Sequence, residues 1–351
     1  MNLNFYNLPT GDLPYDDIQL CKRMMLRLYE QVPFLPELPL INPNDEIFHK
    51  TIENFPCINF NEGKMFIEDN NDNKLMQTVD LMNEIYNSEP PYDLDMLSTD
   101  TPFFNMYIEI LKRIKPKHTV INLVGPFTLC NSIINKNAGS ILSDKLYRKF
   151  ITYLITIKAL WYITKIKQAS PTTRPIIMFD ESKLIRFGTL KRTHEKIDTE
   201  TINTMFVKIF SKLRNEGAYI GVKSFDKCNW QLIIDTNCVD IISFDAYNHP
   251  TSLNILAPSI NNFIAKGGYI NWGIVPVMNE NAIRSLNVNT IYNRFNSTID
   301  TLSSQGVSMD LLLKHSTVSV QGNLSKYPIL YAEKSILTAN SLANKVFDKH
   351  K

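Results

Sequence analysis

Short apolar runs alternate with longer segments of helical spacing along most of this chain, and this alternation limits the possible folds more than any other feature. The apolar runs lack interspersed polar residues, which is typical of parallel strands covered on both faces. The clearest runs are 119–124, 175–179, 218–222, 239–244 and 269–275, and three weaker runs are 2–8, 57–60 and 316–320. Helical spacing of apolar residues characterises the segments 18–31, 75–86, 102–114, 140–167, 198–215, 252–266 and 281–305.

Eight strand-like runs with seven helical segments between them predict a (β/α)8 barrel, the TIM barrel. The barrel is expected to form a single domain from residues 1–351, with a polar hairpin or loop inserted near 62–74 after the second strand. An open doubly wound sheet has the same alternation and is the alternative. The segment 32–43 contains four prolines and is therefore expected to be extended.

Glycines mark the ends of three predicted helices. Gly217, Gly267 and Gly306 each stand one or two residues beyond a segment of helical spacing. Glycine at this position adopts the left-handed conformation with the least strain, so these residues are expected to terminate the helices.

The charges of the chain nearly cancel, with 37 lysines and arginines against 35 aspartates and glutamates. No strong field is therefore expected to attract nucleic acid or an anionic membrane. The N-terminal residues have neither a basic start nor a long apolar core, and no later segment is an uninterrupted apolar stretch long enough to span a membrane. We expect a cytoplasmic protein whose partner is a small molecule, such as an amino acid.

Carboxylates follow two of the predicted strands, and the carboxyl ends of barrel strands meet at the active site. Asp180 and Glu181 follow the run 175–179, and Asp245 follows 239–244. Carboxylates can bind an amine, ligate a metal or act as general acid and base, whereas a single aspartate is more often a helix N-cap or an ion-pair partner. We expect Asp180 and Asp245 to be catalytic and Asp180 and Glu181 to bind substrate.

A lysine and three aromatic residues accompany these carboxylates. Lys223 follows the run 218–222, where a neighbouring carboxylate either perturbs its pKa or simply pairs with it. We expect Lys223 to be catalytic. Trp230, Tyr247 and Trp272 are expected to bind substrate as flat apolar walls, although a single tryptophan is more often part of the core.

Metal ligands are not arranged in a recognised pattern. Cys228, Cys238, Asp245 and His249 are near one another in the sequence, but their spacing matches no zinc motif. The five cysteines include no CxxC pair, which disfavours both a disulfide framework and a closed structural zinc site. A zinc site rebuilt from these residues is the less favoured alternative.

Six short motifs occur in the order found in a known enzyme family. They are GDLP at 11–14, PELP at 36–39, GPFTL at 125–129, FDE at 179–181, DIISFDAY at 240–247 and GGYINWGIVP at 267–276. In this order the chain resembles the single-barrel relatives of cobalamin-independent methionine synthase, in the superfamily that also contains uroporphyrinogen decarboxylase. The resemblance covers residues 9–325 and implies the same (β/α)8 barrel.

The resemblance implies a zinc site that this chain has largely lost. In the family a zinc ion activates the thiol of homocysteine for methyl transfer, because a metal-bound thiol is deprotonated at neutral pH. The family's ligands are a His-x-Cys pair, an acidic residue and a late cysteine, which correspond here to Lys223, Phe225, Asp245 and Gly322. Only Asp245 can bind zinc, so we expect no cofactor. Asp180 corresponds to the aspartate that helps to hold the amino acid.

Three functions remain open from the sequence. The first is methyl transfer to a thiol amino acid, through a modified or metal-free site. The second is a non-catalytic relative that binds a small molecule. The third is a lyase like uroporphyrinogen decarboxylase, which is expected to hold its acidic substrate with arginines near the first strand, and the first 20 residues contain none.

Overall fold

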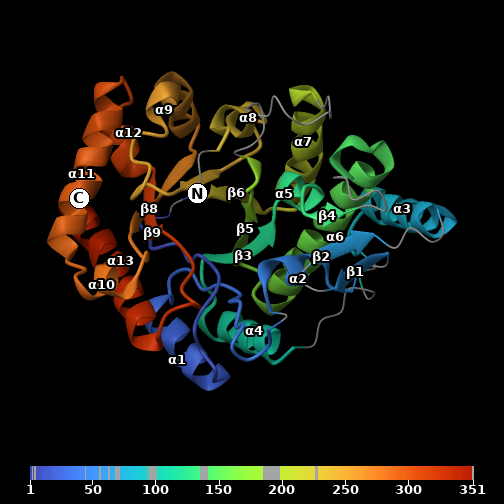
Figure 1. Ribbon diagram of the computed structural model, residues 1–351, viewed down its shortest axis with the longest axis horizontal. Helices are drawn as coiled ribbons and strands as arrows, with labels where there is room; N and C mark the ends of the chain where they lie inside the picture. Colours follow the sequence, from blue (N-terminus) through green and yellow to red (C-terminus); the bar gives the residue numbers. More distant parts are fainter. Residues whose placement is uncertain are drawn as a thin grey trace.

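A six-stranded parallel sheet is the centre of the computed structural model, and its strand order is β3-β5-β6-β7-β8-β9. The structure describes residues 1–351 except 2, 4, 44, 55–56, 62–63, 68–71, 93, 95–100, 135–140, 185–197, 226–227 and 350–351. The strands are β3 (His118–Val124), β5 (Arg174–Asp180), β6 (Tyr219–Ser224), β7 (Ile241–Phe244), β8 (Tyr269–Val275) and β9 (Ser316–Val320). The sheet curls into a half-barrel (Figure 1), which confirms the mixed α/β class and the parallel sheet.

Helices lie on the outer side of the curved sheet (Figure 1). They are α1 (Ile18–Leu28), α4 (Pro102–Ile114), α6 (Lys145–Ala169), α7 (Thr199–Asn215), α8 (Trp230–Asp235), α9 (Ala257–Ala265), α11 (Val288–Ser304), α12 (Met309–Lys314) and α13 (Ile329–Lys349). Every residue of β3 and β8 is buried, because helices cover one face of the sheet and barrel-interior side chains fill the other. The strong apolar signal of the strands follows from this double burial.

The three glycines predicted to end helices have the expected backbone conformation. Gly217, Gly267 and Gly306 have φ values of 85°, 91° and 98°, so all three adopt the left-handed conformation. The predicted helix 281–305 is in fact two helices, α10 (Glu280–Arg284) and α11. The chain breaks there because the side chain of Asn287 caps α11 by accepting hydrogen bonds from the N–H groups of its first turn.

The run 57–60 does not belong to the main sheet, and its expected place as a barrel strand is wrong. It contributes to β1 (Ile58–Asn61), which pairs antiparallel with β2 (Lys64–Ile67). β2 pairs in turn with the short strand β4 (Ile133–Ile134), so these three strands form a separate sheet. Part of the predicted insertion 62–74 is thus β2, and its last residues open α3 (Asp72–Asn87). The rest lies outside the described residues.

Two irregular segments lie along the two edges of the half-barrel. Residues 6–8, here the N-terminal edge segment, run parallel to β9 through hydrogen bonds from Leu8 N–H to the Val318 carbonyl (2.8 Å) and from Val318 N–H to the Tyr6 carbonyl (3.1 Å). Within the predicted strand 2–8, residues 2 and 4 lie outside the described residues.

Residues 33–37 form the proline-rich edge segment on the other side. It runs parallel to β3, where Leu35 N–H donates to the Val120 carbonyl at 3.2 Å and Val120 N–H donates to the Pro33 carbonyl at 3.0 Å. Beyond the N-terminal edge segment, residues 11–13 pair with Glu37 of the proline-rich edge segment. Leu13 N–H donates to the Glu37 carbonyl at 2.9 Å, and Glu37 N–H donates to the Gly11 carbonyl at 3.0 Å. Prolines remove backbone donors, which explains why this segment pairs at isolated points only.

Several helices lack a counterpart among the predicted ones. They are α2 (Ile47–Ile52), α5 (Pro126–Cys130), α8, α12 and α13, whereas the 3-10 turns η2 (Ile141–Ser143) and η4 (Asn254–Leu256) lie within the predicted helical segments 140–167 and 252–266. α13 packs on β9 and α11, and its buried residues include Ile336, Leu342 and Val346. Within the described ranges, no helix is long and apolar enough to cross a membrane.

Candidate functional site

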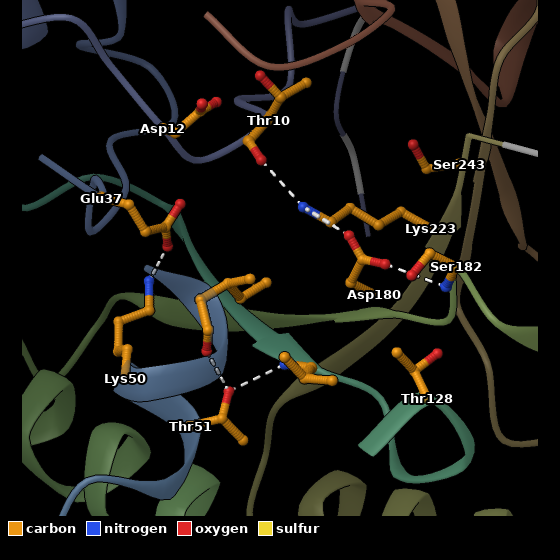
Figure 2. A network of polar contacts seen from close by, with 12 residues as sticks. Thr10, Asp12, Glu37, Lys50, Thr51, Thr128, Asp180, Ser182, Lys223 and Ser243 are labelled. Atoms are coloured by element: carbon orange, nitrogen blue, oxygen red, sulfur yellow. Dashed lines mark hydrogen bonds and ion pairs between the residues drawn. The ribbon is translucent and has the colours of Figure 1, made fainter. Parts of the chain in front are cut away.

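Three polar side chains form one row across neighbouring strands at the carboxyl end of the sheet. Asp180 on β5 is in register with Lys223 on β6, and Lys223 is in register with Ser243 on β7. Residues in register on parallel strands project from the same face, so the row faces the barrel interior. Figure 2 shows these side chains together with Thr10. We call Thr10, Asp180, Lys223 and Ser243 the mouth site.

An ion pair is the central feature of the mouth site. The ammonium of Lys223 lies 3.6 Å from Oδ2 of Asp180 and donates a hydrogen bond of 3.0 Å to the carbonyl of Thr10. The other carboxylate oxygen of Asp180 accepts a 3.0 Å hydrogen bond from Ser182 N–H. The Lys223 side chain is 7% exposed and that of Asp180 is 18% exposed, so the carboxylate is the more accessible member of the pair. The structure therefore brings together two of the three predicted catalytic residues.

Glu181 follows Asp180 directly but projects away from the mouth, because consecutive strand residues face opposite sides. Its carboxylate is fully buried and accepts hydrogen bonds from Phe127 N–H (3.0 Å), Thr128 N–H (2.8 Å) and the Thr128 hydroxyl (2.8 Å). These donors belong to the first turn of α5, so Glu181 joins β5 to that helix. With this carboxylate so engaged, the geometry does not favour the predicted contact of Glu181 with substrate.

Burial raises the pKa of Glu181 to about 8, against the three hydrogen bonds that favour its ionised form. The ordinary value is 4.5, so between these values the folded chain holds a proton that the unfolded chain has released. The contribution of Glu181 to the free energy of unfolding is therefore fully present below pH 4.5, and it is lost as the pH rises to 8.

We therefore expect the stability advantage of the wild type over Glu181→Gln to shrink as the pH rises from 5 to 8. The slope is at most about 1.4 kcal/mol per pH unit, the value for one titrating group. Urea unfolding of both proteins at several pH values measures the difference, in which all other titrating groups cancel. A difference that stays constant across this range would contradict the raised pKa.

Asp245 occupies a different position from the one expected of a catalytic group. It is 3% exposed, and its carboxylate accepts hydrogen bonds from Asn248 N–H (2.8 Å), the Asn248 amide (2.7 Å) and the Gln321 amide (2.9 Å). Asp245 follows β7 and Gln321 follows β9, so this carboxylate ties two loops together at the same end of the sheet. Its role in catalysis stays a prediction.

The predicted aromatic walls are mainly structural in this geometry. Trp272 is fully buried, packs edge-on against Phe244 and Phe295, and donates from Nε1 to the Ser316 hydroxyl at 2.8 Å. It therefore fills the layer between β8 and α11. Trp230 begins α8 and is also buried, whereas Tyr247 is half-buried beneath the guanidinium of Arg294, 4.2 Å from its ring centre. None of the three contacts the ion pair in the interactions that the structure describes.

The polar row of the mouth site continues onto β8 and β9, where Asn271 is in register with Ser243 and Thr317 is in register with Asn271, and sequence reasoning missed this continuation. Asn271 donates from its amide to the hydroxyls of Ser243 (2.8 Å) and Ser319 (3.0 Å), and its amide oxygen accepts from Thr317 (3.0 Å). Barrel interiors are usually filled by branched apolar residues. The signal was present in the sequence, because Asn271 stands in the middle of an otherwise apolar run.

A second ion pair, also missed, joins the proline-rich edge segment to α2. Glu37 and Lys50 are 4% and 6% exposed and form an ion pair (Figure 2). Burial lowers the pKa of Lys50 well below its ordinary value, and the nearby cations Lys223 and Lys158 act in the same direction. Gly11 is required beside this pair, because a β-carbon there would lie 2.2 Å from a Glu37 carboxylate oxygen and φ is 129°. The available signal in the sequence was Glu37, a charged residue within the otherwise apolar stretch from Leu35 to Leu38.

The residues at the positions of the family's zinc ligands do not fit a zinc ion. Lys223 directs its ammonium to Asp180 and Thr10, Phe225 places its ring 5.8 Å from that ammonium, and Gly322 has no side chain. Within the described ranges, no group of three or more His, Cys, Asp or Glu side chains is placed to hold a metal ion. A site rebuilt from Cys228, Cys238, Asp245 and His249 therefore finds no support in this part of the chain.

No protein-family model matches this chain, and no curated protein matches it. The chemistry of the mouth site therefore carries the functional argument.

Proposed function

We propose that this protein is a divergent relative of cobalamin-independent methionine synthase whose mouth site binds a free amino acid as a zwitterion. The single observation that carries the proposal is the ion pair between Asp180 and Lys223 at the carboxyl end of the sheet. The resemblance of the six motifs supports the family, and the geometry of the ion pair supports the ligand class. Binding without zinc-dependent thiol activation is the function that this site favours.

We also propose that the half-barrel is closed into a barrel of eight extended segments. Six of these are the strands of the main sheet, and the N-terminal and proline-rich edge segments are the other two. Support comes from the parallel pairing of the N-terminal edge segment with β9, of the proline-rich edge segment with β3, and of residues 11–13, which follow the first segment, with Glu37 of the second. The PELP motif at 36–39 lies at the carboxyl end of the proline-rich edge segment, and the carboxyl ends of barrel strands carry the functional residues.

A zwitterion matches the two charges of the mouth site. The carboxylate of Asp180 can accept hydrogen bonds from an α-ammonium group, and the ammonium of Lys223 can donate to an α-carboxylate. At 3.6 Å the two groups are slightly beyond hydrogen-bonding distance, so a ligand that contacts both has little direct bonding to displace. The Thr10 carbonyl orients the ammonium in advance, which lowers the entropy cost of binding.

Thiol activation through zinc does not follow from these residues. An ammonium at position 223 can hold an anion but cannot form a bond to sulfur, and Phe225 and Gly322 offer no ligand atom. A substrate like that of uroporphyrinogen decarboxylase is also disfavoured, because one cation beside one carboxylate does not complement a ligand with many carboxylates. The mouth site is therefore best suited to a small molecule with one charge of each sign.

Calorimetric titration with blocked amino acids tests this proposal. We expect methionine or homocysteine to bind with a Kd between about 1 μM and 1 mM, the usual range for small metabolites. N-acetylmethionine lacks the ammonium and methionine amide lacks the carboxylate, so each should bind at least about 10-fold more weakly, the effect of one lost charge contact. Equal affinity for the free and blocked forms, or binding of a tetrapyrrole in place of all of them, would refute the proposal.

A further inference from the structure

A cavity lies between the N-terminal edge segment and the helices α1 and α13. Its volume is about 370 Å³, within the range of small-molecule sites, and neither Asp180 nor Lys223 lines it. Its walls are the N-terminal edge segment, the end of α1 with the residues that follow it, and the last turns of α13. α1 and α13 lie side by side in Figure 1, and the Asn340 amide joins them by donating to the Leu28 carbonyl at 2.9 Å.

Asn7 is the most informative residue of this cavity. It is 6% exposed, and neither its amide nitrogen nor its amide oxygen has a hydrogen-bond partner among the residues that the structure describes. Its backbone is held in place because its neighbours Tyr6 and Leu8 both bond to Val318 of β9. A buried amide without partners destabilises a fold, so a group that supplies both a donor and an acceptor is expected to bind there.

Four aromatic residues line the same cavity as this amide. They are Phe5, Tyr6, Tyr29 and Phe347. Tyr29 is 3% exposed, and burial raises the pKa of its hydroxyl, whereas the neighbouring Asn7 side chain lowers it. The contact between the two side chains does not have the geometry of a hydrogen bond, so the Asn7 amide can turn to a ligand. Aromatic faces favour a planar ligand, because flat rings stack on them with good contact.

Charge in the cavity lining is either paired or exposed. Arg27 forms an ion pair with Glu333, and the only other charged residue of the lining is Glu30. Glu333 offsets the charge of Arg27, and Glu30 is exposed to solvent that screens its charge, so the lining has no buried unpaired charge that would attract a charged ligand. This arrangement distinguishes the cavity from the mouth site, where the charges themselves are the recognition groups.

We infer that this cavity binds a neutral planar heterocycle that carries a hydrogen-bond donor and acceptor on one edge, the chemical class of a nucleobase. The ligand edge pairs with the amide of Asn7, and the ring lies among the aromatic side chains. The site is independent of the proposed amino acid site, because none of the residues that line it belongs to the mouth site. It is thus suited to a second substrate or to an effector.

The test uses the full chain and four probes, adenine, cytosine, uracil and nicotinamide, in calorimetric titrations. At least one probe is expected to bind with a Kd below about 1 mM. Asn7→Leu keeps the volume of the side chain and removes both polar atoms, so it should weaken that binding at least about 10-fold. Its denaturation midpoint should equal or exceed that of the wild type, since an unpartnered buried amide is removed.

Two controls locate the binding. Asp180→Asn should leave probe binding unchanged, and Asn344→Trp should block it, because Asn344 is an exposed residue of the same lining. Asn344→Trp also keeps the test decisive if Asn7→Leu does not fold. The inference is overturned if no probe binds, if both cavity variants bind as the wild type does, or if only Asp180→Asn loses binding. The last outcome places the probe at the mouth and leaves the amino acid proposal untouched.

Discussion

Replacement of Asp180 by alanine is expected to weaken amino acid binding at least about 30-fold while the chain still folds. The substitution removes the carboxylate that accepts from the ligand ammonium, and it leaves the Lys223 ammonium with the Thr10 carbonyl as its described partner. Loss of one member of a largely buried charge pair costs about 2–5 kcal/mol of binding free energy, which corresponds to this factor. Calorimetric titration of the best-binding amino acid measures the change.

Two further variants separate recognition from structure. Asp180→Asn keeps the shape and the oxygen that accepts from Ser182 N–H, but removes the charge, so it should also bind poorly. Ser182→Ala should bind as the wild type does, because its backbone N–H contacts Asp180 and its exposed side chain is not required. Normal binding by Asp180→Ala, with circular dichroism showing an intact fold, would remove Asp180 from the site.

Replacement of Gly125 by alanine is expected to destabilise the protein by about 3–5 kcal/mol, the upper range for overpacking combined with lost buried hydrogen bonds. The backbone angles at Gly125, φ −72° and ψ 155°, suit any residue, so the conformation itself is not the difficulty. A β-carbon there would lie 2.2 Å from the carboxyl carbon of Glu181. Glu181 cannot move aside without breaking its three hydrogen bonds to α5.

Equilibrium unfolding in urea measures this effect, and two variants test its cause. Gly267→Ala has φ 91° but nothing within 4 Å of the new β-carbon, so only backbone strain of about 1–2 kcal/mol is expected. In a Glu181→Ala background, Gly125→Ala should cost little, because the clashing carboxylate is absent. An equal cost of Gly125→Ala in both backgrounds would show that Glu181 is not the obstacle.

The main strands could be predicted because their signal is local and strong. β3, β5 and β8 are buried on both faces, so nearly every residue of each run is apolar, and no helical pattern competes. The segment that pairs with β3 at the edge of the sheet could not be found in this way. It consists of residues 33–37, whose prolines lack backbone N–H donors and whose Glu37 interrupts the apolar pattern.

The same reason explains why the run 57–60 was misplaced. It carries the pattern of a strand and forms one, but its pairing partner β2 is only a few residues away. A propensity for extended structure does not specify the sheet that a strand joins, because pairing depends on which backbone edge is free in space. The apolar residues of helix α13 have helical spacing in the sequence, but this helix was not recognised among the predicted ones.

By itself, the sequence determined the parallel sheet, the placement of its strands, the helix ends at three glycines and the presence of carboxylates and a lysine at strand ends. Only the tertiary structure decided what those groups do. Asp180 and Glu181 are adjacent in the chain, yet one pairs with Lys223 at the mouth and the other caps a helix. Thr10 and Lys223 meet across 213 positions. Periodicity and propensity report contacts within a segment, whereas direction and partner are set by register and packing between segments that the chain order does not specify.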